Sequence, residues 1–128
     1  MSLVTRHSPH GVRESVDRLI TALDARGITV FARIDHGGGA RAAGLALADE
    51  ELLLFGDPRV GTLLMQSDPS VGYELPLRIL VWDEGGTTTI GYRSPVDLGD
   101  SHALAGHDDV LHAMTGLLAD LSSEACAP

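Results

Sequence analysis

Two amphipathic helix patterns, one near each end of the chain, limit most strictly what this sequence can fold into. Apolar side chains recur at helical spacing in residues 11–27 and again in residues 107–125. Each stripe is only one helix face wide, so each helix must bury that face against another layer. Gly27 ends the first pattern, as expected of a residue that adopts the left-handed conformation at a helix C-terminus. The sequence therefore predicts two long, one-faced helices.

Strand patterns account for most of the remaining chain. Residues 3–8 and 28–35 have strand composition, and residues 50–56 form a continuous apolar run that is typical of a strand with neighbours on both sides. Residues 77–93 predict a hairpin, because two β-rich runs flank the turn residues 83–86. These runs predict a largely antiparallel sheet.

The two kinds of pattern together predict an α+β fold in which both long helices cover one face of the sheet. The other sheet face is then left for solvent or for a partner. Asp57 and Pro58 have the residue types of an N-cap and a first helical position, which predicts a short helix between strands. The length fits a single domain over residues 1–128, with residues 1–3 interpreted as partly a cloning remnant and residues 123–128 expected to fray.

The charge excludes two classes of partner. The chain has a net charge of −9 and its 9 basic residues are all arginines, with no cationic cluster. Nucleic acids and anionic membranes are therefore not expected as partners. The single Cys126 has no internal partner, and the first residues lack the apolar segment of a signal peptide. We expect a cytoplasmic protein.

The stretch "FARIDHGGGARAAG" raises the possibility of nucleotide binding. Gly37, Gly39 and Ala42 match G-x-G-x-x-A after a predicted strand. The following helix pattern is only about two turns long and is interrupted by Gly44, and the later elements form a hairpin instead of a parallel sheet. We favour a flexible turn between strand and helix over a dinucleotide loop.

The same stretch contains a candidate catalytic pair, Asp35 and His36. Adjacent side chains on a strand point to opposite faces, so the two cannot form a hydrogen-bonded acid–base pair while the strand continues. Structural roles are favoured for both. We expect Asp35 to cap the glycine turn or the short helix, and His36 to be hydrogen-bonded at the sheet edge.

A metal site is not expected, and neither is any other cofactor. His102, His107 and His112 are five residues apart, whereas ligands on one helix face are three or four residues apart.

Four segments together resemble the family known as domain of unknown function 302: "FARIDH", "LLLFGDPRVGTLLMQSDP", "YELPLRILVWDEGGTTTIGYRSP" and "LGDSHAL". The resemblance covers almost the whole chain. It implies a strand-helix-four-strand-helix fold, similar to one repeat of the TATA-binding protein, and a homodimer. It implies no established activity. Asp57 stands where the family usually has asparagine, and Gly37 to Gly39 stand where it more often has alanine.

Among the positions on which the family pattern falls, residue by residue, five are candidate ligand-binding residues: Asp35, His36, Gly56, Asp57 and Thr62. The turns after residues 28–35 and 50–56 both follow strand ends, so we expect them to converge at one rim of the sheet. A small pocket beside a helix N-terminus would then hold an anion or a small polar ligand.

Two functions are consistent with these residues. The favoured one is a homodimeric small-ligand-binding or interaction module, with apolar residues on both sheet faces: Phe31, Leu80, Trp82, Ile90 and Tyr92. The alternative is a small hydrolase- or isomerase-like enzyme that uses His36 as a general base oriented by Asp35 or Asp57. The second hypothesis requires His36 to lie in a concave site beside a carboxylate.

Overall fold

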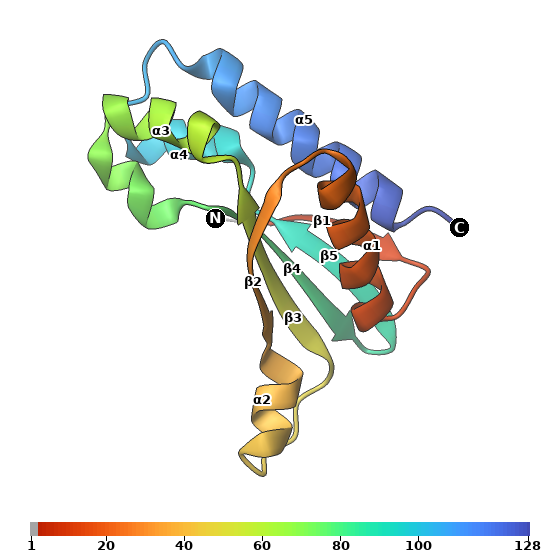
Figure 1. Ribbon diagram of the computed structural model, residues 1–128. Coiled ribbons are helices and arrows are strands. Elements are labelled where there is room, and N and C mark those ends of the chain that lie inside the picture. The colour runs from red at the N-terminus through yellow and green to blue at the C-terminus, as the bar shows by residue number, and fades with distance from the viewer. Residues whose placement is uncertain (1–2) are drawn as a thin grey trace.

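The computed structural model describes residues 3–128 and consists of one antiparallel sheet with its long helices on one face (Figure 1). In chain order the elements are β1 (Val4–Ser8), α1 (Val12–Ala25), β2 (Thr29–Asp35), α2 (His36–Ala42), β3 (Glu50–Gly56), α3 (Pro58–Ser67), η1 (Pro69–Glu74), β4 (Leu77–Glu84), β5 (Thr87–Tyr92), η2 (Pro95–Asp97), α4 (Leu98–Ser101) and α5 (Asp108–Ala125). This order confirms the predicted α+β class and the strand-helix-four-strand-helix arrangement.

The sheet has the strand order β1-β5-β4-β3-β2, and every neighbouring pair is antiparallel. β4 and β5 form the predicted hairpin. Gly85 and Gly86 occupy its turn with φ values of +62° and +93°. Residues other than glycine rarely adopt such positive φ values. The carboxylate of Asp83 accepts a hydrogen bond from the Gly86 N–H at 2.7 Å and closes the turn.

α1 and α5 lie side by side on one face of this sheet (Figure 1). Their apolar stripes meet the inward side chains of β3, β4 and β5, which alternate along each strand. We call the resulting cluster the sheet core; its largest fully buried members include Leu19, Leu23, Leu53, Phe55, Ile79, Val81, Ile90, Leu118 and Leu121.

A second, smaller core lies beyond one end of the sheet. Here α3, η1 and α4 gather against the first turns of α5 (Figure 1). We call residues 58–74 and 95–107 the α3–α4 lobe. The buried side chains of this second core are Leu64, Val71, Leu98, Leu104, Leu111 and Met114.

The C-terminal residues differ from the expectation that they fray. α5 continues to Ala125, whose side chain is fully buried. Arg18 of α1 donates to the carbonyl of Ala125 at 3.0 Å and to that of Ala127 at 2.8 Å. His10 also lies 2.6 Å from the Ala127 carbonyl. Side chains from the start of the chain thus satisfy carbonyls that a helix end leaves without partners. Of residues 1–3, only Leu3 is among the described residues.

Candidate functional site

The two turns predicted to converge lie at opposite ends of the β2–β3 hairpin. β2 and β3 are antiparallel, with Asp35 paired to Glu51 and Thr29 paired to Gly56. The strand rise of about 3.4 Å per residue separates Asp35 from Gly56 by roughly 20 Å. The predicted single pocket is therefore wrong. Successive strand ends meet at one edge only when the strands are parallel.

Asp35 has the capping role expected of it. Its carboxylate accepts a hydrogen bond from the N–H of Gly38 at 2.8 Å and so caps α2. Gly37 to Gly39 lie inside this helix, not in the predicted flexible turn. A Cβ atom at Gly38 would lie 2.5 Å from the Asp35 carboxylate, so glycine permits this close approach.

His36 is exposed at the start of α2, which projects away from the sheet (Figure 1). Within residues 3–128 its ring makes no hydrogen bond, contrary to the predicted bond at the sheet edge. Asp57 lies near the opposite end of the hairpin, and the Asp35 carboxylate is engaged in the cap. The geometry therefore gives His36 no carboxylate that would orient it as a base.

Asp57 follows β3 and caps α3, as predicted. It accepts a hydrogen bond from the Arg59 N–H at 3.0 Å and forms an ion pair with the Arg59 side chain at 2.9 Å. The hydrogen bonds from Arg59 hold the pKa of the Asp57 carboxyl below its usual value. Thr62 donates to the carbonyl of Pro58 at 2.6 Å within the same helix.

Gly56 and Asp57 line a cavity of about 590 Å³ between the sheet and the α3–α4 lobe. Its walls come from β2, β3, α3, η1, the start of β4, and α5. Asp57 contributes the only ionisable side chain among the lining residues. The apolar lining residues include Ile28, Phe31, Leu54, Val60, Met65, Leu75, Leu77, Met114 and Leu117.

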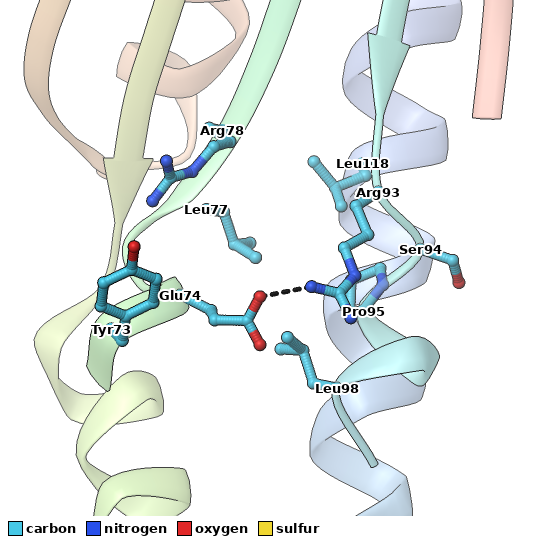
Figure 2. A pocket seen from close by; sticks show the side chains of 9 residues that line it. All are labelled: Tyr73, Glu74, Leu77, Arg78, Arg93, Ser94, Pro95, Leu98 and Leu118. Atoms are coloured by element: carbon cyan, nitrogen blue, oxygen red, sulfur yellow. Dashed lines mark hydrogen bonds and ion pairs between the residues drawn. The ribbon is translucent and has the colours of Figure 1, made fainter. Parts of the chain in front are cut away.

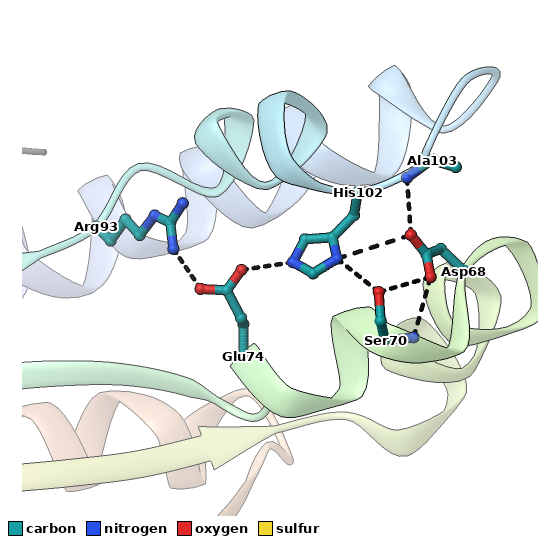
Figure 3. Close-up of polar contacts among 6 residues, drawn as sticks. All are labelled: Asp68, Ser70, Glu74, Arg93, His102 and Ala103. Atoms are coloured by element: carbon teal, nitrogen blue, oxygen red, sulfur yellow. Dashed lines mark hydrogen bonds and ion pairs between the residues drawn. The ribbon is translucent and has the colours of Figure 1, made fainter.

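A chain of polar contacts spans the α3–α4 lobe (Figure 3). The ring of His102 lies between η1 side chains, with Nε2 at 2.6 Å from a Glu74 oxygen and Nδ1 at 2.9 Å from the Ser70 hydroxyl. Arg93, just after β5, donates through Nη1 to the other Glu74 oxygen. These contacts tie η1 both to the end of the sheet and to the segment that follows α4.

Asp68 completes this connection. Its carboxylate accepts hydrogen bonds from the Ala103 N–H at 2.9 Å and from the Ser70 hydroxyl at 2.7 Å. The Ser67 hydroxyl donates to the Ala103 carbonyl at 2.7 Å. The hydrogen bond from Ala103 is the main reason that the pKa of Asp68 lies below its usual value. For Glu74 the hydrogen bond with His102 has the largest effect, and it also lowers the pKa. We call this set of contacts the lobe clasp.

The order of residue types in the clasp is that of a catalytic triad, with a hydroxyl, an imidazole and a carboxylate in series: Ser70, His102 and Glu74. The Ser70 hydroxyl, however, also donates to Asp68. Ser70 and His102 line neither the cavity at Asp57 nor a smaller cavity on the sheet side of the clasp. A nucleophile needs its hydroxyl proton directed at the base and an open place for the substrate. We therefore interpret this series as a structural fastening.

A second cavity, of about 250 Å³, lies on the sheet side of the clasp (Figure 2). Glu74 reaches across it toward Arg93, and Arg78 stands at its margin. Leu77, Pro95, Leu98 and Leu118 supply apolar walls.

Sequence reasoning missed both the clasp and this cavity. It considered His102 only as a metal ligand, and it gave Glu74 and Arg93 no role. The contact between Glu74 and His102 joins positions 28 residues apart on irregular segments. Neither helical nor strand periodicity carries a signal for such a pair. The described residues contain no group of three or more side chains arranged to hold a metal ion.

Comparison with curated proteins finds relatives that are named as ion channels. The chain is 41% identical over 109 residues to "Fluoride-specific ion channel FluC 1" of Brucella suis biovar 1 (strain 1330) and to the protein of the same name from Brucella abortus biovar 1 (strain 9-941). The match covers 84% of this chain but only 43% and 40% of those relatives, so the chain spans less than half of their length. Within residues 3–128, no helix has the length and hydropathy required to cross a membrane.

The fold has a counterpart among solved structures. The crystal structure of an uncharacterized conserved DUF302 protein from Bacillus stearothermophilus matches with a TM-score of 0.86 and 23% identity, over 99% of both chains. Residues 4–121 also match the sequence model of the family described as "Domain of unknown function DUF302". The chain, as its sequence motifs indicated, belongs to the DUF302 family.

Proposed function

We propose that this domain is a binding module for a small, largely apolar molecule, which it holds in the cavity of about 590 Å³. The apolar lining of that cavity is the observation that carries the proposal. Its volume lies within the range of about 300–1,000 Å³ that is typical of small-molecule sites. Transfer of an apolar molecule from water to such walls is favourable in proportion to the apolar area buried.

Asp57 limits what the ligand's polar end can be. Its carboxyl has a lowered pKa and is ionised at neutral pH, so it accepts hydrogen bonds. A hydroxyl or amine group on the ligand suits this position. An anion does not, because two negative charges would then share an apolar site. The anionic ligand expected beside Asp57 is not proposed for this cavity.

The test uses N-phenyl-1-naphthylamine, an uncharged fluorophore with one N–H donor. We expect its emission to rise on binding. Leu117→Trp places a larger side chain on the cavity wall, and we expect it to weaken binding by about tenfold, or about 1.4 kcal/mol. Leu63→Trp is the matched control, since Leu63 is exposed on α3 and does not line the cavity. Equal affinity in the two variants would contradict the proposal.

A homodimer through the open sheet face is the assembly that we propose for this module. Ile79 and Val81 point into the sheet core, so Leu80 and Trp82, which alternate with them along β4, point to the opposite face. Trp82 lies across Gly91 there, since a Cβ atom at Gly91 would be 2.8 Å from its ring. Phe31 is 53% exposed and extends this apolar surface. Such a surface favours self-association over solvation.

Light scattering coupled to size exclusion tests the dimer. We expect Leu80→Glu to shift the protein to monomer, because it would bury a charge in the interface. Leu45→Glu, at a leucine exposed in the α2–β3 connection, should leave the dimer intact. A wild-type protein that is monomeric at all concentrations would contradict this assembly.

Ion conduction is not proposed for this chain, because the channels named above are more than twice as long as the matched segment. The cytoplasm is the compartment that we propose. The single cysteine, Cys126, is a free thiol, as reducing compartments favour.

A further inference from the structure

The smaller cavity has positive charge in a chain that is otherwise strongly acidic. The net charge of the chain is −9, yet two arginines and a single acid line this cavity: Arg78, Arg93 and Glu74. An excess of arginine in a concave, partly apolar place is the usual electrostatic setting for an anion.

Arg93 has donors that the protein does not use. Its Nη1 donates to Glu74, while its Nε is buried and has no acceptor among residues 3–128. The Nε–H and one Nη2–H lie along the same edge of a guanidinium group, and a carboxylate accepts from such an edge with both oxygens. Buried donors nearly always have a partner, so this edge of Arg93 indicates a missing acceptor.

Arg78 supplies a second cation to the lining of the same cavity. The β4–β5 pairing ends at Leu80 and Gly91, and beyond it Arg78 and Arg93 line the cavity from two separate segments (Figure 2). The Arg78 side chain is exposed and makes no hydrogen bond or ion pair to any of residues 3–128. An anion in this cavity would be attracted by both guanidinium groups.

Glu74 does not fill this need. One of its oxygens accepts from Arg93, and the other is 2.6 Å from Nε2 of His102 (Figure 3). Both oxygens are therefore engaged in the lobe clasp, and neither forms a hydrogen bond or ion pair with Arg78. The cavity keeps an uncompensated cation at its margin.

The remaining lining residues indicate what the uncharged part of the ligand would be. Leu77, Leu98 and Leu118 face the same space as the Glu74–Arg93 pair (Figure 2). The cavity, at about 250 Å³, is smaller than a typical drug-sized site of about 300–1,000 Å³. We propose that this cavity binds a small monocarboxylate with a short hydrocarbon body, its carboxylate held by Arg93 and Arg78 and its hydrocarbon against the leucines. The site does not depend on the larger cavity or on the dimer.

The test is a titration of the full chain with hexanoate, followed by calorimetry and by amide shifts in 15N-labelled protein. We expect saturable binding with shifts concentrated in residues 73–78 and 93–98. Hexanamide, which has the same body without the charge, should not bind. Inorganic phosphate and fluoride, which have charge without a hydrocarbon body, should bind more weakly than hexanoate.

Arg78→Gln is the decisive variant, because Arg78 is exposed and unpaired and its loss should leave the fold unchanged. We expect hexanoate to bind about tenfold more weakly, as for loss of one charge-assisted contact. Arg13→Gln is the matched control: it changes the net charge equally, at an exposed arginine of α1 whose side chain has no partner among residues 3–128. Arg93→Lys keeps the charge but loses the planar edge, and should also weaken binding.

Three results would overturn the proposal. One is the absence of saturable hexanoate binding to the wild-type protein. Another is equal affinity of the Arg78→Gln and Arg13→Gln variants. The third is binding of phosphate, fluoride or hexanamide at least as tight as that of hexanoate. Failure of the naphthylamine test in the larger cavity would leave this site standing, and failure here would leave the larger cavity standing.

Discussion

The sheet core and the α3–α4 lobe achieve their order by different means. The sheet core packs fully buried leucines, valines and isoleucines of two long helices against three central strands. The second core has six buried apolar residues, and the surrounding lobe depends in addition on the polar contacts of the lobe clasp.

The difference follows from size. Short helices and 3₁₀ turns bury little apolar area, while ordering each residue costs about 1–2 kcal/mol of backbone entropy. Hydrogen bonds and ion pairs at fixed positions supply order where apolar area is scarce. Both cavities are bounded by residues of the two cores, with Leu77 lining each of them. Both cavities thus lie where the sheet core meets the α3–α4 lobe.

Truncation in the sheet core should have the largest effect. Phe55 is fully buried, and Phe55→Ala should lower the free energy of unfolding by about 3–5 kcal/mol. Leu64→Ala in the lobe should cost less, about 2 kcal/mol, because the lobe can close around the space. Urea unfolding followed by circular dichroism measures both. If the lobe variant costs as much as the core variant, the two regions do not differ as described.

Loss of one carboxylate should reveal how far the lobe depends on polar contacts. Glu74→Gln keeps the shape but not the charge that Arg93 and His102 share, and we expect a loss of about 1–3 kcal/mol in stability. Glu84→Gln is the control, at an exposed glutamate at the end of β4. A similar small effect of both variants would show that apolar packing alone holds the lobe.

Acid should separate the two regions. The hydrogen bond with His102 and the charge of Arg93 hold the pKa of Glu74 below its usual 4.5, and the Ala103 N–H holds that of Asp68 below its usual 3.8. A lowered folded-state pKa gives stability that is complete above the usual value and is lost as the pH falls through the folded value. We expect the lobe to open before the sheet core once the pH falls below about 4.

Hydrogen exchange measures this order of opening. The Ala103 amide, which donates to Asp68, should lose protection at a higher pH than the amides of Leu53 and Ile79 in the sheet. In Glu74→Gln the pH dependence of lobe protection should become shallower. Simultaneous loss of protection in both regions would contradict a separate lobe.

His36→Ala should have the smallest effect. The ring is exposed at the start of α2, where β2 ends, and has no hydrogen-bond partner among residues 3–128. We expect the free energy of unfolding to change by no more than about 0.5 kcal/mol, as for an ordinary surface substitution, and the melting temperature to change little. A loss of several degrees would mean that the ring has a contact that this geometry lacks, and would reopen its role.

Local patterns predicted the elements and their caps. The stripe that includes Leu19 and Leu23, the run from Glu50 to Gly56, and the turn at Gly85 and Gly86 each depend on residues close in sequence. Asp35 and Asp57 could be read as caps for the same reason, because a cap contacts an N–H only two or three residues away.

What the sequence by itself determined, then, was the fold class, the element order and the family. Only the tertiary structure decided the site. Whether Asp35 lies near Asp57 depends on the antiparallel pairing of β2 with β3, and whether Glu74 meets His102 depends on how η1 packs on the segment after α4. Periodicity specifies which face of an element is buried. The meeting of distant irregular segments is fixed by the packing of the whole chain, and there the two cavities and the clasp are formed.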